Sequence, residues 1–279
     1  MLLARTVERD NSSEIVKEAF IRFPLRLGED TFTTGRIGPK TQKRLIAVLR
    51  GFRALAAAYG AKYLRACATS ALREARNGSA VTRAVRRHAG VALEILNGRE
   101  EARLILAGFA PQLGNRGFLY VDIGGGSTEI SLVQRGRAVA SRSFRLGAVR
   151  LLHREPPARV WEGVENFLAK LRRRYGSFHG VGSGGSIGKV RDLLGLGTDE
   201  PFQLADARKL LKRLAQLSPE ERMSRYDLKP DRADGIVPAG RILLFVMKEA
   251  GLKEMLAPPL SLADGLAREI FYRARRRRN

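Results

Sequence analysis

A glycine turn between two hydrophobic segments constrains the fold of this chain more than any other feature. Gly117–Val121 is aromatic and β-branched and is predicted to be a strand, as is Ile130–Val133. Between the segments lie Asp122, Gly124, Gly125, Gly126, Ser127, Thr128 and Glu129. Successive glycines let the backbone turn tightly and let its N–H groups approach an anion closely. An ordinary hairpin needs one or two glycines and no flanking acids, so the pattern favours a phosphate-binding turn.

The two acids that bracket the turn are candidate metal ligands. Asp122 precedes the glycines and Glu129 follows them. Carboxylate oxygens are the ligands that hard divalent cations prefer, and a cation held here would face the anion bound by the turn. The sequence therefore predicts a phosphate loop with a metal ion.

Length and composition limit the class of protein. The chain has 279 residues, enough for two compact domains or one large one, and a globular hydrophobic content of 44%. No segment has the apolar length of a membrane span, so no membrane partner is expected. The N-terminal apolar stretch is too short for a signal peptide, and a single cysteine, Cys67, excludes an internal disulfide framework. Both features fit a reducing cytoplasm.

The net charge is strongly positive. Lysine and arginine number 51 against 28 acidic residues, which gives a net charge of +23. Such a field attracts polyanions, whether nucleic acid, an anionic membrane or a chain of phosphates. Charge alone does not choose among these partners.

The order of predicted elements indicates an α/β protein. In the first half, strands are predicted over 1–9, 14–26, 62–68 and 91–96. A loop is predicted at 27–35, and helices over 39–60, from an N-cap at Ser79 to Gly90, and over 99–109. In the second half, strands are predicted over 117–122, 129–133, 138–144, 178–181 and 254–256. Helices are predicted over 158–175, 231–250 and 262–273, and two more are predicted to begin after 182–186 and after Ser218. Each half begins with strands and then alternates, which predicts two domains, 1–112 and 113–279, with the last helix packing back on the first domain.

A second glycine loop follows the strand at 178–181. Its residues Gly182, Ser183, Gly184, Gly185 and Ser186 open a helix, and a helix N-terminus with free N–H groups is a second anion site. The segment also fits the serine-hydrolase pattern Gly-x-Ser-x-Gly, but all three histidines precede it in the chain, against the order that fold requires. A Walker A loop is excluded because Val190 replaces the metal-binding hydroxyl and Ser183 replaces a glycine.

Two further segments have open interpretations. Arg73, after Thr69 and Ser70, is placed to bind an anion at a strand-to-helix turn, but a solvated helical turn explains it equally well. Glu101 could orient or deprotonate a water molecule that attacks phosphorus. A glutamate in a first helical turn also complements the helix dipole, and this segment by itself favours that structural reason.

Six motifs in one order supply the context. They are Ala66–Gly78, Asn97–Leu104, Val121–Glu129, Leu146–Leu151, Gly182–Ser186 and Asp231–Asp234. Their order and spacing resemble the exopolyphosphatase/guanosine-pentaphosphate phosphohydrolase (Ppx/GppA) family over nearly the whole chain. The length resembles that of members with only the two N-terminal domains.

The resemblance implies a fold and a reaction. The fold would be that of actin, Hsp70 and sugar kinases, two ribonuclease-H-like α/β domains enclosing a cleft. The reaction would be Mg²⁺- or Mn²⁺-assisted hydrolysis of a terminal phosphoanhydride bond, releasing orthophosphate from polyphosphate or guanosine pentaphosphate. The family often looks dimeric, so a homodimer is an open alternative to a monomer.

The resemblance also assigns roles to residues. Glu101 aligns with the catalytic base, and Asp122 and Glu129 align with the acids that organise the metal and water. Arg73 aligns with a phosphate-binding arginine. The two glycine segments, Gly124–Thr128 and Gly182–Ser186, align with phosphate loops.

One departure from the family pattern affects the expected activity. The family begins with a strand and a loop resembling Asp-x-Gly-Ser-Asn, and Met1–Val7 matches only the strand after that loop. The first domain is therefore expected to lack its opening strand and its own phosphate loop. Weak hydrolysis, or a polyphosphate- or alarmone-binding protein without catalysis, is the alternative function. A nucleic-acid-binding protein is suggested by charge alone, with few aromatic side chains to stack on bases.

Overall fold

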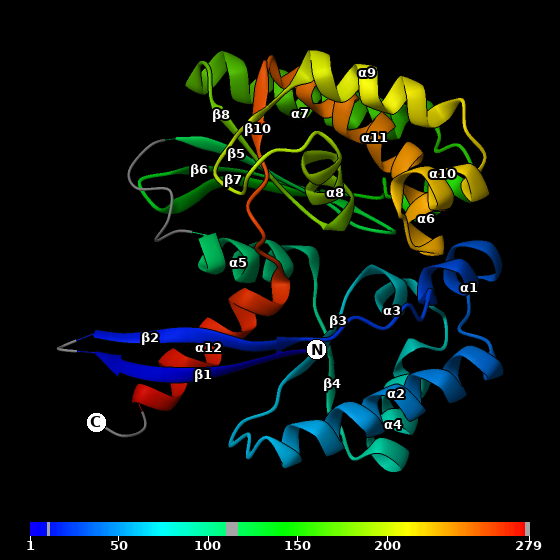
Figure 1. The fold of residues 1–279 in the computed structure, drawn as a ribbon, viewed down its shortest axis with the longest axis vertical. Coiled ribbons are helices and arrows are strands. Elements are labelled where there is room, and N and C mark those ends of the chain that lie inside the picture. Colours follow the sequence, from blue (N-terminus) through cyan, green and yellow to red (C-terminus); the bar gives the residue numbers. More distant parts are fainter. Residues whose placement is uncertain (10–11, 110–116, 277–279) are drawn as a thin grey trace. The chain divides into compact units, whose positions relative to one another are not determined.

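The chain folds into two compact units (Figure 1). A computed structural model describes residues 1–9, 12–109 and 117–276. Unit 1 comprises Met1–Pro111 and Leu260–Asn279, and unit 2 comprises Gln112–Pro259. The domain boundary predicted between residues 112 and 113 lies outside the described residues. Among the described helices, none combines the length and apolar character needed to cross a membrane.

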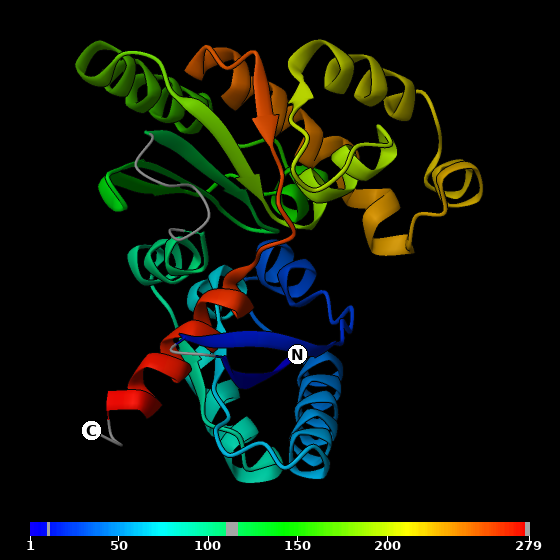
Figure 2. The same cartoon turned by 60° about the vertical axis from the view of Figure 1, so that its left-hand side comes forward.

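Unit 2 is built on one mixed sheet, whose strands are seen most openly in Figure 2. Its strands are β5 (Phe118–Ile123), β6 (Thr128–Gln134), β7 (Arg137–Phe144), β8 (His179–Ser183), β9 (Phe202–Gln203) and β10 (Glu254–Leu256). The order across the sheet is β7-β6-β5-β8-β10-β9. Since β5 pairs antiparallel with β6 and parallel with β8, it joins a three-stranded meander to a parallel pair.

The predicted meander is confirmed, and its sequence explains it. Leu119 and Tyr120 on β5 and Ile130 and Ser131 on β6 are all fully buried, and since successive residues point to opposite faces, the sheet is covered on both faces here. The turn between β6 and β7 is formed by two residues with positive φ, Arg135–Gly136. Positive φ at both turn residues is the geometry that matches the twist of a tight hairpin.

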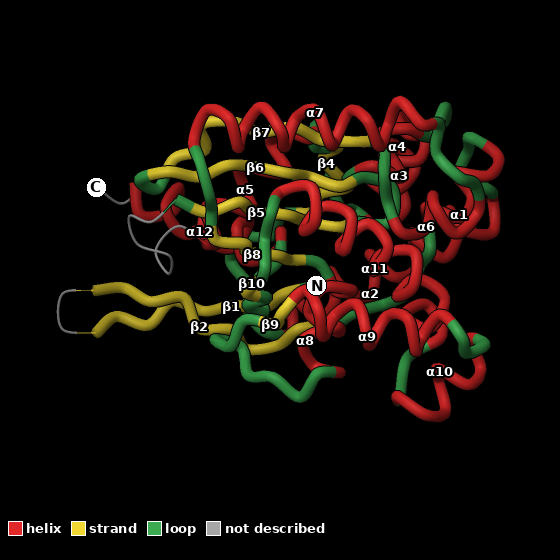
Figure 3. The backbone as a smooth tube through the Cα atoms, turned by 90° about the horizontal axis from the view of Figure 1, so that it is seen from above, coloured by secondary structure: helices red, strands yellow, loops and turns green. Residues whose placement is uncertain are grey.

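Helices pack against the sheet of unit 2 and against one another (Figure 3). They are α6 (Ala148–His153), α7 (Ala158–Tyr175), α8 (Gly185–Leu193), α9 (Leu204–Ala215), α10 (Pro219–Tyr226) and α11 (Pro230–Ala250). The long helix α11 contacts α6, α7, α8, α9 and α10, and its apolar residues are part of one continuous core with the sheet. The predicted cap at Ser218 is confirmed as a complete capping box with Glu221.

Unit 1 contains two separate pairs of strands and six helices among the described residues. The strands are β1 (Leu2–Arg9), β2 (Ser12–Phe20), β3 (Ala66–Ala68) and β4 (Leu93–Ile95). The helices are α1 (Leu27–Thr34), α2 (Pro39–Ala58), α3 (Ser70–Glu74), α4 (Gly78–Ala89), α5 (Gly98–Phe109) and α12 (Leu262–Arg276).

The two strand pairs of unit 1 have the same pairing directions as the strands on either side of β5 in unit 2. β1 and β2 form an antiparallel hairpin, like β6 and β7, and β3 and β4 form a parallel pair, like β8 and β10. Within the described part of the chain, no strand joins these two pairs as β5 joins its neighbours. Phe20 and Phe23, at and just after the end of β2, are 63% and 49% exposed. The apolar surface of this unit is thus less completely covered than that of unit 2.

Two local predictions in unit 1 are wrong. The loop predicted at 27–35 contains α1, a helix that begins with Glu29 and Asp30 in its first turn and ends at Gly35 in a left-handed conformation. Ser79 lies inside α4 and does not cap it. The helix starts at Gly78, after Asn77, whose side-chain amide does not cap the helix and exchanges two hydrogen bonds with the backbone of Ile37.

Helix α12 packs within unit 1 against β1, β2 and α5. Gly265 makes the approach to α5 possible, because a Cβ atom there would lie 1.8 Å from the carbonyl oxygen of Leu104. Two ion pairs surround this contact, Lys17–Asp264 at 2.6 Å and Arg103–Glu269 at 3.0 Å. The close backbone approach holds the C-terminal helix to α5, and the Lys17–Asp264 pair links it to the N-terminal hairpin of the same unit.

Replacing Gly265 with alanine tests this packing. The new methyl group meets rigid backbone, so Gly265→Ala is expected to lower the free energy of unfolding by about 1–3 kcal/mol. Gly51→Ala in α2 is the matched control, because no atom lies within 4 Å of the place its methyl group would take, and helical alanine is favoured by about 0.5–1 kcal/mol. Urea unfolding followed by circular dichroism measures both. Equal stability of Gly265→Ala and the parent chain would contradict the packing of α12 on α5.

The single thiol gives a chemical test of the fold of unit 1. Cys67 is half-buried on β3, and burial raises the pKa of its thiol to about 11 from 9.0. At pH 8 the thiolate fraction is then about a hundredfold lower than in the unfolded chain, while a more basic thiolate reacts about tenfold faster. Alkylation by iodoacetamide is therefore expected to be about tenfold slower in the native chain than in urea. Equal rates would show that Cys67 is not buried.

Candidate metal and phosphate site

The glycine turn joins β5 to β6 in unit 2. The Gly124 N–H donates to the Ser127 carbonyl at 2.9 Å, which closes the turn. Asp122 and Glu129 are directly opposite each other in the antiparallel register, at the ends of β5 and β6. Directly opposed residues have side chains on the same face of the sheet, so the two carboxylates are neighbours.

The carbonyl groups of the turn are bonded to α6. The N–H groups of Ala148 and Val149 donate to the carbonyls of Gly124 and Gly125 at 2.9 and 2.8 Å. Arg150 Nε donates to the Gly126 carbonyl at 3.1 Å. In a trans peptide the C=O and the next N–H point in opposite directions, and the described chain has no cis peptide. The N–H groups of Gly125, Gly126 and Ser127 therefore point away from α6, as an anion-binding turn requires.

Gly147 allows α6 to approach the turn. A Cβ atom at this position would lie 2.5 Å from the Gly125 carbonyl oxygen and the Gly126 nitrogen. Any other residue would therefore push α6 off the turn. The sequence motif Leu146–Leu151 contained this glycine, but no local pattern showed that it contacts residues more than twenty positions earlier.

Asp122 is held by hydroxyl groups from its own sheet. Ser183 Oγ, on the neighbouring strand β8, donates to Asp122 Oδ1 at 2.7 Å. The Tyr120 hydroxyl shares a hydrogen bond with the same Ser183 oxygen. Burial raises the pKa of Asp122, and the Ser183 hydrogen bond partly offsets that rise. Ser183, predicted as a phosphate ligand, is thus placed where it orients Asp122.

Glu129 is more deeply buried than Asp122. It is 1% exposed, and its Oε1 atom accepts a hydrogen bond from Ser143 Oγ on β7 at 2.7 Å. A carboxylate oxygen of Asp122 lies within 4.8 Å of one of Glu129. Two neighbouring carboxylates repel each other when both are ionised, and a cation between them removes that repulsion. The all-oxygen donor set suits Mg²⁺ or Mn²⁺.

The second glycine loop lies next to Asp122. Gly184 adopts a left-handed φ of 95°, and a Cβ atom there would lie 2.9 Å from Asp122 Oδ1. The loop leads directly into α8, whose first residue is Gly185. The Arg232 guanidinium from α11 packs against Gly185, where a Cβ atom would lie 1.7 Å from it. Arg232 therefore brings positive charge to this loop, a role that the motif Asp231–Asp234 did not reveal.

Three predicted hydroxyl ligands are largely buried. Ser127, Thr128 and Ser186 are between 0% and 7% exposed. Thr128 Oγ1 donates to the Leu146 carbonyl at 2.5 Å, so this hydroxyl stabilises the approach of the α6 segment. An anion bound by this turn would therefore be held mainly by backbone N–H groups.

The two site residues predicted in unit 1 come together. Arg73 on α3 and Glu101 on α5 form an ion pair of 3.3 Å, and Arg73 also donates to the Leu96 carbonyl at 2.7 Å. Glu101 is 7% exposed. The first turn of α5 is capped by other groups: Asn97 Oδ1 accepts from two backbone N–H groups, and Glu100 Oε2 accepts from the Asn97 N–H. Glu101 is therefore not the capping residue of this helix.

Comparison with known proteins identifies relatives along most of the chain. The model of the Ppx/GppA phosphatase family matches residues 8–271. Exopolyphosphatase 2 of Mycobacterium tuberculosis is 29% identical over 87% of this chain and 86% of its own length. Exopolyphosphatase 1 of Mycobacterium bovis is 38% identical over 48% of this chain and 41% of its own length.

Solved structures share the fold. An exopolyphosphatase from Cytophaga hutchinsonii superposes with a TM-score of 0.78 at 21% identity, covering 95% of this chain and 91% of that chain. The Aquifex aeolicus Ppx/GppA family member superposes with a TM-score of 0.72 at 22% identity, covering 98% and 94%. The predicted α/β fold class is confirmed by these likenesses and by the mixed sheet of unit 2.

Metal binding to the opposed acids is testable without turnover. Asp122→Asn removes one anionic ligand, so the affinity for Mn²⁺ is expected to fall by at least about tenfold. Glu162→Gln, an exposed carboxylate on α7 of the same unit, is the matched control and is expected to bind Mn²⁺ like the parent chain. Isothermal titration calorimetry measures both. Undiminished affinity in Asp122→Asn would remove this residue from the metal site.

Proposed function

The chain belongs to the Ppx/GppA phosphatase family, and on that premise we propose that it is a phosphoanhydride hydrolase that releases orthophosphate from the end of inorganic polyphosphate. Two mycobacterial relatives are named exopolyphosphatases, and one of them matches over most of its length. The net charge of +23 supports a polyanionic substrate. Guanosine pentaphosphate is the competing substrate, and a comparison of phosphate release from the two decides between them.

The observation that carries the proposal is the arrangement of acids and glycine loops in unit 2. Asp122 lies next to Glu129 on one side and to the second glycine loop on the other. Backbone N–H groups that point away from α6 would bind phosphate oxygens, and the helix N-terminus at Gly185 would add to that binding. Charge stabilisation of this kind is the main contribution a protein makes to phosphoryl transfer.

Asp122 and Glu129 would hold a divalent cation, Mg²⁺ or Mn²⁺. Such an ion neutralises phosphate charge and lowers the pKa of a coordinated water molecule. The residues of this chain would do the rest: Ser183 and Ser143 fix the orientation of the two carboxylates through their hydroxyl groups. These hydrogen bonds support a role for the two carboxylates as metal ligands, because side chains that bind a metal are normally oriented by hydrogen bonds from neighbouring residues.

Glu101 is proposed as the general base. It is buried and ion-paired to Arg73, and Asn97 and Glu100 supply the cap of its helix, so capping does not account for this glutamate. A buried carboxylate beside an arginine has a defined orientation, which general base catalysis requires. Arg73 would hold Glu101 in place and would bind a phosphate oxygen with donors not used in that pair.

A non-catalytic binding protein is the second candidate. It is favoured by one observation: within the described residues, unit 1 has no strand between its two pairs and no glycine turn corresponding to Gly124–Ser127. Fewer backbone donors would then hold the leaving phosphate, and hydrolysis would be slow although binding persists. Competition between polyphosphate and DNA at fixed salt separates phosphate-chain binding from general polyanion affinity.

Substitution of Glu101 tests the catalytic role. Glu101→Gln keeps the shape of the side chain and removes the base, so phosphate release from polyphosphate is expected to fall by about 10²–10⁴-fold. Polyphosphate binding, measured on the same samples by a filter assay, is expected to persist. The neighbouring glutamate is a matched control: Glu100→Gln keeps an oxygen that can accept from the Asn97 N–H, so both the helix cap and phosphate release are expected to persist.

The outcomes separate the candidate functions. Phosphate release by the parent chain that is lost in Glu101→Gln supports the hydrolase. Phosphate release that survives Glu101→Gln removes the residue from catalysis. Tight polyphosphate binding without any release by the parent chain, with Mg²⁺ or Mn²⁺ present, supports the binding protein.

A further inference from the structure

Unit 1 carries a surface on which positive charge is concentrated, formed by helices α2 and α4, which pack against each other. Together they contain eight lysines and arginines, five between Lys40 and Arg53 and three between Arg83 and Arg87, and no acid. Each of the other described helices of eight or more residues contains at least one aspartate or glutamate. The two helices therefore carry +8 of the net charge of +23 without any compensating acid.

All eight basic residues are exposed, and the apolar faces of the two helices are turned into the core of unit 1. Leu45 of α2 and Val81 and Val85 of α4 are buried in that core. A helix that binds a membrane surface inserts its apolar face into the lipid, and here both apolar faces are occupied by packing. The surface left to a partner is therefore the basic one.

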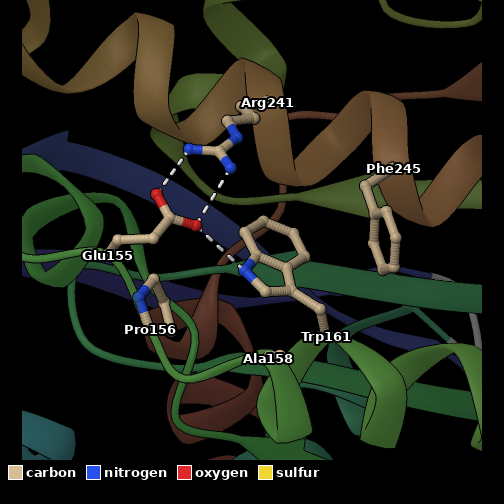
Figure 4. A pocket seen from close by; sticks show the side chains of 6 residues that line it. All are labelled: Glu155, Pro156, Ala158, Trp161, Arg241 and Phe245. Carbon is tan, nitrogen blue, oxygen red and sulfur yellow. Dashed lines mark hydrogen bonds and ion pairs between the residues drawn. The ribbon is translucent and has the colours of Figure 1, made fainter.

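The charges on this surface are not neutralised within the part of the chain that the structure describes. None of the eight side chains forms an ion pair with a described carboxylate, and Glu94 on the adjoining strand β4 is itself paired with Arg65. Exposed arginines elsewhere do have acidic partners, as Figure 4 shows for Arg241 of α11, which donates to both oxygens of Glu155. Like charges one turn apart on a helix repel each other, and a bound polyanion would remove that repulsion.

Two of the arginines are ordered at the point where α2 meets the end of α4. Arg50 donates from Nε and Nη2 to the His88 carbonyl at 3.2 and 2.8 Å, and Arg53 donates to the Ala89 carbonyl at 3.3 Å. Each guanidinium has five N–H donors, so donors remain for phosphate oxygens. Because these side chains are already held in place, binding a ligand would cost less conformational entropy.

Two exposed tyrosines follow at the end of α2 that carries these arginines. Tyr59 comes directly after the helix and Tyr63 four residues later, and they are 59% and 52% exposed. The turn between them is fixed, because Gly60 has a φ of 66° and the Ala61 N–H donates to the Ala56 carbonyl at 2.9 Å. Proteins that bind single-stranded nucleic acid combine cations that contact the phosphates with exposed aromatic side chains on which bases stack.

We propose that α2, α4 and the Tyr59–Tyr63 turn form a binding surface for single-stranded nucleic acid, with phosphates on the basic residues and bases on the two tyrosines. The cations between Lys40 and Arg53 extend over about 20 Å of helix, so they can follow several successive phosphates. A phosphate chain without bases would gain nothing from the exposed rings. None of these residues belongs to the metal and phosphate site, and binding would require neither a metal nor hydrolysis.

Charge reversal tests the basic surface. Lys43→Glu with Arg87→Glu is expected to weaken binding of a fluorescent oligodeoxythymidylate by at least about tenfold, measured by anisotropy on the intact protein with EDTA. The slope of log affinity against log salt should become shallower by about 1.4, since each phosphate contact on a single strand contributes about 0.7. Lys170→Glu with Arg173→Glu on α7 is the matched control, because both residues are exposed and the change in net charge is the same.

The control pair is expected to leave that slope unchanged. Equal losses of affinity in the two double variants would show that only the overall field of the protein attracts the oligonucleotide, and would overturn the proposal. No binding of the oligonucleotide by the parent chain would overturn it as well. Circular dichroism checks that each variant folds.

The tyrosines distinguish nucleic acid from other polyanions. Tyr59→Ala with Tyr63→Ala is expected to weaken oligodeoxythymidylate binding by at least about tenfold, whereas Tyr59→Phe with Tyr63→Phe keeps the rings and should bind like the parent chain. The affinity of the alanine variant for polyphosphate, which has no bases, should equal that of the parent chain. An unchanged affinity of the alanine variant for the oligonucleotide, or an equal loss for both ligands, would overturn the proposal. Tighter binding of phosphatidylglycerol vesicles than of the oligonucleotide would overturn it in favour of a membrane.

Discussion

The pairing of β5 with β6 on one side and β8 on the other is the constraint on which the candidate site depends. It places Asp122 opposite Glu129 and beside Ser183, so that two acids and a hydroxyl from three strands meet at one end of the sheet. Both glycine loops leave the sheet at this end. Because all three strands are central and buried, their registers are firmly specified, and a slip of one residue would turn the acids to the opposite face.

Most polar atoms of the glycine turn between β5 and β6 are used in hydrogen bonds within the fold. The atoms that are not used in this way are the ones that a ligand could contact. The carbonyls of Gly124, Gly125 and Gly126 accept hydrogen bonds from the start of α6, and the Thr128 hydroxyl is bonded to Leu146. What is left facing the other way is a set of backbone N–H groups. Such groups bind an anion without reorganisation, since the carbonyl bonds already hold the peptide planes.

Two arginine–carboxylate pairs differ in how well the remaining charge would be solvated if the pair were broken. Arg73–Glu101 is largely buried, so removal of one partner would leave a charge poorly solvated. Arg241–Glu155 is more than half exposed, so either partner can regain water when the pair opens. The first pair is suited to holding a side chain in one orientation, whereas the second can open without leaving a buried charge.

The amino-acid sequence alone determined the elements whose signals are local. The meander of β5, β6 and β7, helix α7, the Ser218 cap and both glycine loops follow from patterns within a few residues, and the order of motifs indicated the family. Only the tertiary structure decided which groups meet, because those partners are distant in sequence. Ser183 and Asp122 are 61 positions apart, and Arg241 and Glu155 are 86. Helix α1 likewise packs on α3, where Thr31 donates to the Ala71 carbonyl 40 positions away, and Asn77, near the predicted cap Ser79, is bonded to Ile37, also 40 positions away. Local sequence patterns do not predict such contacts, because the contacts form only when packing brings distant elements together.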